Sequence, residues 1–190
     1  MKRFYLFILC ALACVSAYAQ QFNGVEMSGN RTDFVSRYLH DRPSASVVYE
    51  VETETAIKDQ FLDSQVTIYV QRVYGRTTDD IWGLWFDIIF PKSADWDSMV
   101  KQYDEVLDHL SQQYGNPHSW LKLRNFDSPY SEGRHKGYEL YALKYGKCSY
   151  SDTFFFNEWK LYMSIQHVED VVNSTTYNSI MISLNPDSKR

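Results

Sequence analysis

Between Ala94 and Tyr114, hydrophobic positions recur at steps of three and four residues, which is the strongest pattern in the chain. This spacing places them along one side of an α-helix, as in a helix that lies on a sheet. Ser93 is suited to cap the N-terminus of this helix, and Gly115 and Pro117 are typical of its end. The apolar stripe consists of Trp96, Met99, Val100, Tyr103, Val106, Leu107, Leu110 and Tyr114.

A shorter helix is predicted near the beginning of the chain, before Pro43. Asn30 can cap it, and Asp33 lies in its first turn, where the helix dipole favours an acidic side chain. Its apolar stripe is made of Phe34, Val35, Tyr38 and Leu39. This spacing predicts a second helix that buries one side.

Alternation of hydrophobic and polar residues predicts β-strands in much of the remaining chain. The clearest runs span residues 47–51, 66–70, 82–90, 159–165 and 180–184, and weaker ones span 120–126 and 138–145. The run at 82–90 is apolar on both faces at several positions, so we place it in the centre of the sheet. Glu50, Glu52 and Glu54 occupy alternate positions, which predicts one solvated strand face whose like charges discourage edge pairing.

The order of these elements, helix then strands and again helix then strands, predicts an α+β fold. We expect an antiparallel sheet with both helices on one face, and the order is compatible with two α-β-β-β halves. No segment has the composition of an interdomain linker, so residues 20–190 are expected to form a single domain.

Residues 1–19 have the composition of a secretory signal peptide. Lys2 and Arg3 precede an apolar stretch, and Ala17-Tyr18-Ala19 provides small residues at the positions that signal peptidase reads. The apolar stretch is shorter than the roughly 20 residues needed to span a bilayer, which favours cleavage over a membrane anchor. A lipoprotein attached at Cys14 is the other alternative. We therefore expect a periplasmic or secreted protein with no membrane span in the mature chain.

The composition narrows the possible partners and the redox chemistry. Lysine and arginine number 19 against 24 acidic residues, and a formal net charge of -5 argues against a nucleic-acid partner, which requires a basic surface. Cys10 and Cys14 leave with the signal peptide, so the exported chain keeps only Cys148 and cannot form an internal disulfide. We interpret Cys148 as a structural thiol.

Two further local patterns are structural motifs rather than catalytic ones. The first is Phe22-Asn23-Gly24-Val25 followed by Gly29, and the second is Leu107 and Leu110 followed by Tyr114-Gly115 and Pro117. They resemble small exported proteins from Gram-negative gut anaerobes, a family to which no activity is assigned. The arrangement of a helix followed by strands also looks like the fold of β-lactamase inhibitor protein and of BamE-type envelope proteins. The second resemblance implies a binding or assembly module rather than an enzyme.

Candidate chemistry in the sequence is sparse. No zinc, Walker, dinucleotide-binding or nucleophilic-serine motif is present, so we expect neither a metal nor a cofactor. We therefore do not expect this protein to be an enzyme. The alternatives to a binding module are an envelope-assembly or structural protein, or a hydrolase with dispersed carboxylates and histidines. The candidates for the hydrolase are Glu50, Glu52, His118 and His135.

Aromatic residues are the one unusual surplus, at 16% of the chain and including 15 tyrosines. Exposed aromatic side chains with polar neighbours are typical of recognition surfaces, whereas extra core packing is the structural alternative. The candidate ligand-binding residues are Tyr130, Tyr138, Tyr141 and His135, with Phe154-Phe155-Phe156 interpreted as lying near the same loops. The sequence therefore favours an exported binding module. Its partner would be a protein or a glycan of the cell envelope, bound by these loops or by an aromatic sheet face.

Overall fold

The computed structural model describes residues 21–73, 78–118, 122–127, 137–156, 159–171 and 173–187. These residues form the helices α2 (Arg31–Asp41), α3 (Trp96–Tyr114) and α4 (Glu139–Lys144). A small two-stranded ribbon comes first, made of β1 (Gln21–Phe22) and β2 (Val25–Glu26). The other strands are β3 (Ser46–Glu50), β4 (Glu54–Phe61), β5 (Ser64–Arg72), β6 (Ile81–Ile89), β7 (Leu123–Phe126), β8 (Cys148–Phe156), β9 (Trp159–Asp170) and β10 (Thr175–Pro186).

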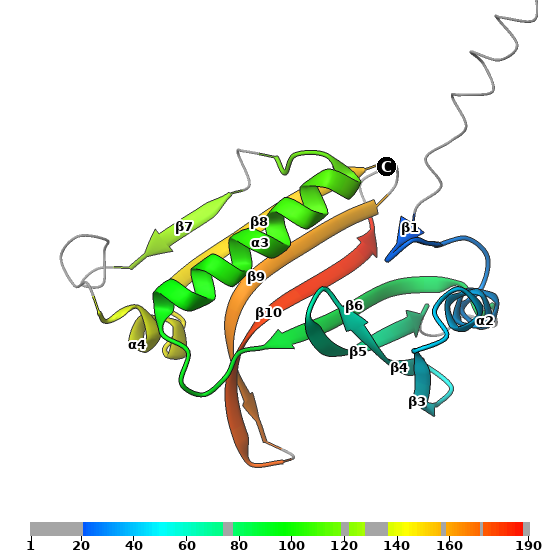
Figure 1. Cartoon of the computed structure of the whole chain (residues 1–190), viewed down its shortest axis with the longest axis horizontal. Coiled ribbons are helices and arrows are strands. Elements are labelled where there is room, and N and C mark those ends of the chain that lie inside the picture. The colour runs from blue at the N-terminus through cyan, green and yellow to red at the C-terminus, as the bar shows by residue number, and fades with distance from the viewer. Residues whose placement is uncertain are drawn as a thin grey trace, which may run out of the picture.

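These eight strands form one sheet in the order β3-β4-β5-β6-β10-β9-β8-β7, with every neighbouring pair antiparallel. Strands β3 to β6 follow α2, and β7 to β10 follow α3. The last strands of the two halves, β6 and β10, pair at the centre of the sheet (Figure 1). The predicted α+β class with an antiparallel sheet is thus confirmed. The predicted count of three strands after each helix was wrong, because each half contributes four.

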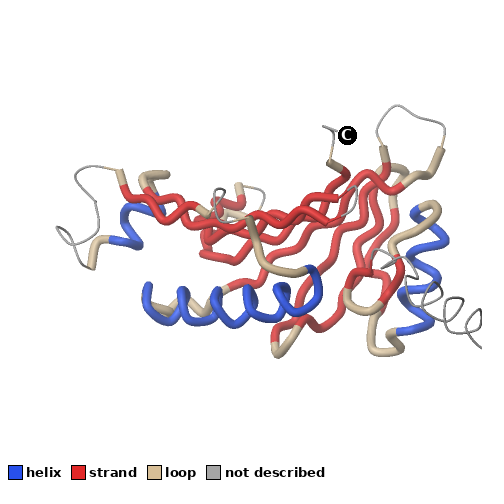
Figure 2. Tube along the Cα trace, turned by 90° about the horizontal axis from the view of Figure 1, so that it is seen from above, coloured by secondary structure: helices blue, strands red, loops and turns tan. Residues whose placement is uncertain are grey.

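Helices α2 and α3 cover the same face of the sheet. In β4, Asp59 accepts a hydrogen bond from Tyr38 of α2 at 2.8 Å, and the Phe61 ring contacts the His109 ring of α3, with centroids 5.5 Å apart. Asp59 and Phe61 are two residues apart on one strand, so their side chains point to the same side. Figure 2 shows the twist of the sheet and the two helices that pack against it. We call the side opposite α2 and α3 the helix-free face.

The hydrophobic core lies between the sheet and the two helices, and its centre is the pairing of β6 with β10. The side chains that meet there are Leu84, Phe86 and Ile88 of β6 and Leu184, Ile182 and Ile180 of β10. Each of them is at most 1% exposed. This pairing therefore joins the apolar surfaces of both halves into one cluster.

The ends of the helices follow local rules, with one correction. Asn30 caps α2 as predicted, because its side chain accepts a hydrogen bond from the backbone of Asp33 at 2.8 Å. Asp95, not Ser93, caps α3, so this helix begins at Trp96, two residues after the predicted start at Ala94. Gly115 ends α3 with a φ of 82°, a conformation that L-residues with a side chain rarely adopt.

The prediction of a strand at residues 138–145 was wrong, because this segment contains α4. Ala142 and Leu143 are both buried at adjacent positions, whereas an alternating strand would bury every second residue. The helix contacts β8 and β9. A short run of mixed residues suits one and a half helical turns as well as a strand, so packing against the rest of the fold decides between them.

The prediction that Glu50, Glu52 and Glu54 share one strand face was also wrong. β3 ends at Glu50, Glu52 lies in a turn, and Glu54 begins β4. The chain reverses there through backbone hydrogen bonds between Val51 and Glu54. Phe154-Phe155-Phe156 belongs to β8 rather than to a loop.

Among the described residues, no helix is both long enough and apolar enough to cross a membrane. The predicted signal peptide, residues 1–19, lies outside the described residues, and its cleavage stays a prediction.

Candidate functional site

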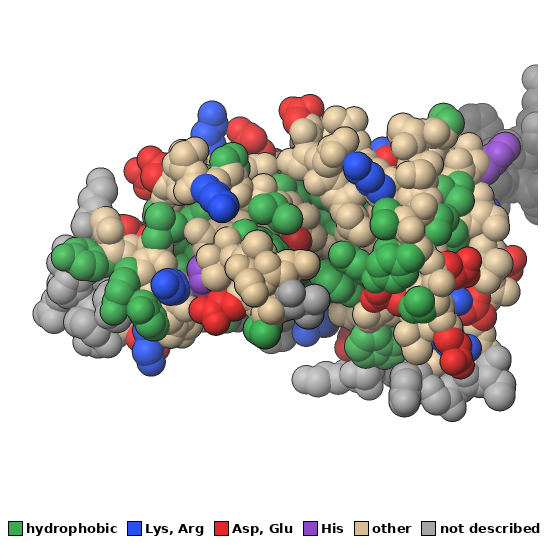
Figure 3. Space-filling model, turned by 90° about the horizontal axis from the view of Figure 1, so that it is seen from below, with side chains coloured by type: hydrophobic (Ala, Val, Ile, Leu, Met, Phe, Trp, Pro, Cys, Tyr) green, Lys and Arg blue, Asp and Glu red, His purple; other side chains and the backbone are tan. Residues whose placement is uncertain are grey.

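The helix-free face of the sheet contains a groove of about 280 Å³. Its lining residues come from β4, β5, β6 and β10 and are Lys58, Gln65, Val66, Thr67, Tyr69, Trp85, Asp87, Ile89 and Tyr177. We call it the Asp87 groove. In the view of Figure 3, hydrophobic side chains gather beside a hollow near the middle of the molecule.

Strand β6 provides three side chains of this groove. Trp85, Asp87 and Ile89 alternate with the core residues of β6, and this alternation turns them to the helix-free face. Tyr69 of β5 is the direct cross-strand neighbour of Trp85, and the two rings stack with centroids 4.1 Å and planes 14° apart. The stacked pair gives the groove an apolar wall on adjacent, hydrogen-bonded strands.

The carboxylate of Asp87 is held by two donors from the second half of the chain. Its Oδ1 accepts hydrogen bonds from Ser179 Oγ at 2.9 Å and from Gln166 Nε2 at 3.2 Å. No residue in the described ranges donates to its Oδ2. The orientation of the carboxylate is thus fixed through one oxygen, and the other oxygen is available to a ligand.

Burial and charge set the protonation of the groove. Burial raises the pKa of the Asp87 carboxyl, and hydrogen bonds from Ser179 and Gln166 oppose this only in part. Burial also raises the pKa of Tyr177 and of Tyr69, and nearby carboxylates that include Asp87 raise both further. Around neutral pH the two phenols therefore stay protonated and can donate hydrogen bonds beside the carboxylate.

The remaining lining side chains make the groove polar without giving it a dominant charge. Lys58 provides an exposed ammonium, and Gln65 and Thr67 provide an amide and a hydroxyl. One carboxylate, one ammonium, neutral hydrogen-bonding groups and aromatic rings suit the reversible binding of a ligand that has both apolar and polar surfaces. In the described part of the chain, no group of three or more His, Cys, Asp or Glu side chains could hold a metal ion.

Tyr138 and Tyr141, two of the predicted ligand-binding residues, do not line the Asp87 groove. Tyr138 precedes α4 and is 57% exposed, and Tyr141 on α4 is 49% exposed. The ring of Tyr141 contacts that of Tyr145, with centroids 4.4 Å apart. The other two candidates, Tyr130 and His135, lie outside the described residues. The sequence therefore pointed to an exposed aromatic surface at α4, and the described part of it is separate from the Asp87 groove.

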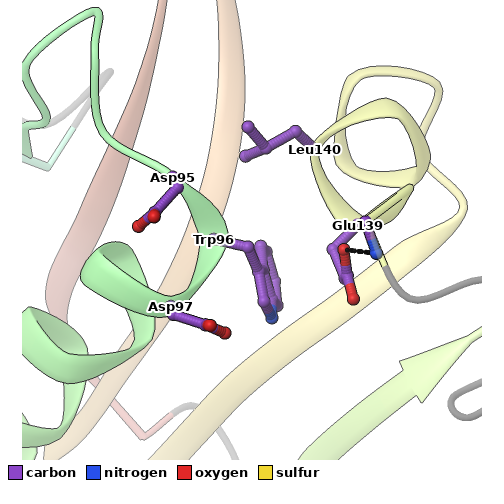
Figure 4. A pocket seen from close by; sticks show the side chains of 6 residues that line it. Asp95, Trp96, Asp97, Glu139 and Leu140 are labelled. Atoms are coloured by element: carbon purple, nitrogen blue, oxygen red, sulfur yellow. Dashed lines mark hydrogen bonds between the residues drawn. The ribbon is translucent and has the colours of Figure 1, made fainter.

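A second hollow, of about 240 Å³, lies between the N-terminus of α3 and α4. Figure 4 shows the Trp96 ring between Asp97 of α3 and Glu139 of α4. Glu139 accepts a hydrogen bond from the backbone of Gly137 at 2.7 Å, and Asp95 is the cap of α3. Glu139 and Asp95 thus accept hydrogen bonds from backbone N–H groups near them. We therefore interpret their role in this hollow as structural, in holding the ends of the helices.

Of the four residues considered for hydrolysis, His135 lies outside the described residues, and the other three are not brought together. Glu50 and Glu52 form ion pairs with Arg31 and Arg72, at 3.7 and 2.5 Å, in the first half of the molecule. His118 lies in the second half, where its backbone N–H donates to a carbonyl of β8. The fold thus places these carboxylates and this histidine in different halves.

Sequence reasoning did not select Asp87. The signal that could have found it is its position, because it is the only charged residue between Ile81 and Phe90 in an otherwise apolar strand. A single carboxylate in a central strand is costly to bury, so such a residue is a candidate for a functional role. Its two hydrogen-bond donors are 79 and 92 residues further along the chain, which no local pattern reveals.

Comparison with protein-family models, curated proteins and solved structures finds none that matches this chain. The function of this protein is therefore inferred from the geometry of the Asp87 groove and from the sequence of the chain.

Proposed function

We propose that this protein is an exported binding module that holds its partner in the Asp87 groove. The observation that carries the proposal is the fixed carboxylate of Asp87 beside the stacked rings of Tyr69 and Trp85. A site that is oriented before the ligand arrives loses less entropy on binding, which is a general property of recognition sites. Aromatic surface beside a few placed polar groups is the usual composition of such sites.

The side chains of the groove favour binding over hydrolysis. Among the described residues that line the groove, Asp87 is the only acid and none is a histidine. Hydrolysis of a glycosidic bond usually requires two carboxyl groups across a cleft, and general acid–base catalysis requires a positioned proton donor and acceptor. The hydrolase alternative would depend on Glu50, Glu52, His118 and His135, of which the described carboxylates and His118 lie in different halves.

Export and the nature of the partner follow from the sequence. The signal-like residues 1–19 place the site of action in the periplasm or outside the cell, where the partner would be a protein or a glycan of the envelope. The formal charge of -5 disfavours nucleic acid. Tyr138 and Tyr141 would form a second contact for a partner that extends to α4.

The experiment that tests this function is affinity capture from envelope and culture-medium fractions with three forms of the purified protein. These are the wild type, Trp85→Ala and the control Trp82→Ala. Trp82 is on the same strand and 50% exposed, but it does not line the groove. Circular dichroism of each variant shows whether it is folded.

We expect one partner to be recovered with the wild type and with Trp82→Ala, and to fall by about tenfold with Trp85→Ala. Equal recovery with all three forms, or no partner with any of them, would contradict the proposal. Tyr141→Ser in the same assay tests α4, and it lowers recovery only if that helix contacts the partner.

A further inference from the structure

We infer that the Asp87 groove binds a neutral saccharide unit. This inference rests on the proposed function and names the ligand class of the same site. The groove occupies about 280 Å³, which is near the lower limit of roughly 300 Å³ for small-molecule sites. The size of the groove thus fits one or two sugar units, either free or as part of a longer glycan.

The chemistry of the lining matches that of a sugar ring, which has hydroxyl groups around its rim and C–H groups on its faces. Oδ2 of Asp87 can accept hydrogen bonds from sugar hydroxyls, because its partner oxygen already holds Ser179 and Gln166. Tyr69 and Trp85 offer ring surface against which C–H groups pack favourably. Each part of a sugar thus meets a suitable group.

Donors around the groove complete the match. Lys58, Gln65 and Tyr177 carry N–H or O–H groups at the lining of the groove and can donate to sugar oxygens. A ligand rich in hydroxyl groups can satisfy donors and acceptors at once, because each hydroxyl does both. The groove therefore suits a polyhydroxylated ligand better than one that only accepts or only donates.

The charges of the groove disfavour the other ligand classes. An apolar side chain placed over Asp87 would remove water from the carboxylate without replacing its hydrogen bonds, which is unfavourable. A cationic ligand would be attracted by Asp87 but repelled by Lys58, and an anionic ligand would meet the reverse, so neither charge is matched by the lining as a whole. A neutral polar ligand meets none of these penalties.

The position of the groove also excludes recognition by strand addition. β5, β6 and β10 each have a hydrogen-bonded strand on both sides, so their backbone groups are already paired. A peptide that adds to a sheet needs an unpaired edge, which this part of the sheet lacks. Recognition must therefore use side chains, as it does for a sugar.

The inference is tested by titrating the purified protein with glucose, galactose, mannose, N-acetylglucosamine and their β1–4-linked disaccharides. Tryptophan fluorescence and amide chemical shifts report binding. The variants are Asp87→Asn, Trp85→Ala and Tyr177→Phe, and the matched controls are Trp82→Ala and the exposed acid variant Asp108→Asn. Asp87→Asn keeps an amide oxygen that can accept from Ser179, and thermal unfolding of each variant verifies its fold.

We expect at least one saccharide to bind saturably, with shifts concentrated on β5, β6 and β10. The affinity should fall by about tenfold with Asp87→Asn and Trp85→Ala, fall less with Tyr177→Phe, and stay within about twofold of wild type in the controls. Binding should also weaken on acidification, because protonation of Asp87 removes its acceptor charge. Binding that is indifferent to both Asp87→Asn and Trp85→Ala would place the sugar elsewhere and overturn the inference.

The capture experiment separates this inference from the proposed function. If no saccharide binds but a protein is captured in a Trp85-dependent manner, the saccharide inference is wrong and the binding module remains. If neither a saccharide nor a protein depends on Trp85, both are wrong.

Discussion

The hydroxyl of Tyr103 on α3 donates a hydrogen bond of 2.9 Å to Oδ2 of Asp152 on β8, a carboxylate with no exposed surface. Arg124 of β7 forms an ion pair with the same oxygen, and its guanidinium lies 3.9 Å from the centre of the Tyr150 ring. This group of tyrosine, aspartate and arginine connects the long helix to two strands of the second half. It satisfies a buried charge that would otherwise destabilise the core.

The first half of the molecule contains the same arrangement. Tyr38 on α2 donates to Oδ2 of Asp59 on β4 at 2.8 Å, and Arg42 Nε donates to that oxygen at 2.7 Å. Both aspartates are on the second strand of their half, and both tyrosines are on the helix that precedes it. The tyrosine and the aspartate therefore occupy equivalent places in the two halves, whereas Arg42 follows α2 and Arg124 lies on β7. The two tyrosine–aspartate pairs give structural support to the division into two halves that the order of elements suggested.

Removing the hydroxyl of Tyr103 should destabilise the fold more than removing that of Tyr38. Asp152 Oδ1 is buried without a hydrogen-bond partner among the described residues, so Tyr103→Phe leaves Arg124 as the main support of this carboxylate. We expect Tyr103→Phe to cost about 2–3 kcal/mol and Tyr38→Phe about 1–2 kcal/mol. Urea unfolding measures both, with the exposed Tyr145→Phe as a control that changes stability by less than about 0.5 kcal/mol. Equal costs for all three would refute the role of these groups.

Asp59 should make the stability depend on pH in the acid range. Burial raises the pKa of its carboxyl, but hydrogen bonds from the Gln60 backbone, Tyr38 and Arg42 outweigh this and hold it below the usual 3.8. The folded state therefore binds a proton less readily than the unfolded chain. The stabilisation that Asp59 contributes is present at pH values above 3.8. It is lost as the pH falls through this value and then through the lower pKa of the folded protein.

Asp59→Asn should therefore flatten the acid limb of the stability profile. At neutral pH we expect it to cost about 3 kcal/mol, because Arg42 loses its buried partner. Below about pH 5 the gap to wild type should narrow, because Asp59 of the unfolded wild-type chain takes up a proton before Asp59 of the folded protein does. Urea unfolding across this pH range checks the prediction, and a constant gap at all pH values would contradict it.

Gly83 and Asn185 should be coupled in stability. A Cβ at position 83 would lie 2.2 Å from Asn185 Oδ1 and 3.2 Å from the backbone oxygen of Leu184. Gly83→Ala alone should therefore cost about 1 kcal/mol, although alanine is otherwise the better strand residue by about 0.5–1 kcal/mol. In the Asn185→Ala background the same change should be neutral or stabilising. A double-mutant cycle from thermal or urea unfolding measures this coupling, and additive effects would show that the contact is unimportant.

Cys148 should be unreactive while the protein is folded. Burial raises the pKa of its thiol to about 12, and the charge of Glu139 contributes further. Since the thiolate is the nucleophile, its reaction with a disulfide reagent at about pH 8 should be roughly a thousandfold slower than in the unfolded chain. Stopped-flow measurement with and without denaturant provides the comparison. Similar rates in the two states would instead indicate an exposed, reactive thiol.

The helices and most strands could be predicted because their signals are local. The three-and-four spacing of α3, the Asn30 cap of α2 and the alternation in β6 each depend on residues within a few positions of one another. The α4 segment could not be predicted, because its mixed pattern suits either conformation and only contact with β8 and β9 decides. Tyr138 and Tyr141 are exposed, and their role in binding stays a prediction, whereas the residues of the Asp87 groove were not foreseen as a site.

By itself the sequence determined the two longer helices, most of the strands and the α+β class, because these follow from periodicity along the chain. Only the tertiary structure decided the order of the strands in the sheet, and therefore which side chains line the Asp87 groove. The alternation of buried and exposed residues in β6 predicts that Asp87 and the core residues point to opposite faces of the sheet. It does not predict which strands lie beside β6. That choice comes from the long-range pairing of β6 with β10, which brings Ser179 and, through β9, Gln166 to the carboxylate of Asp87. Such pairings depend on the packing of the whole core, since side chains distant in sequence must bury their apolar surface together.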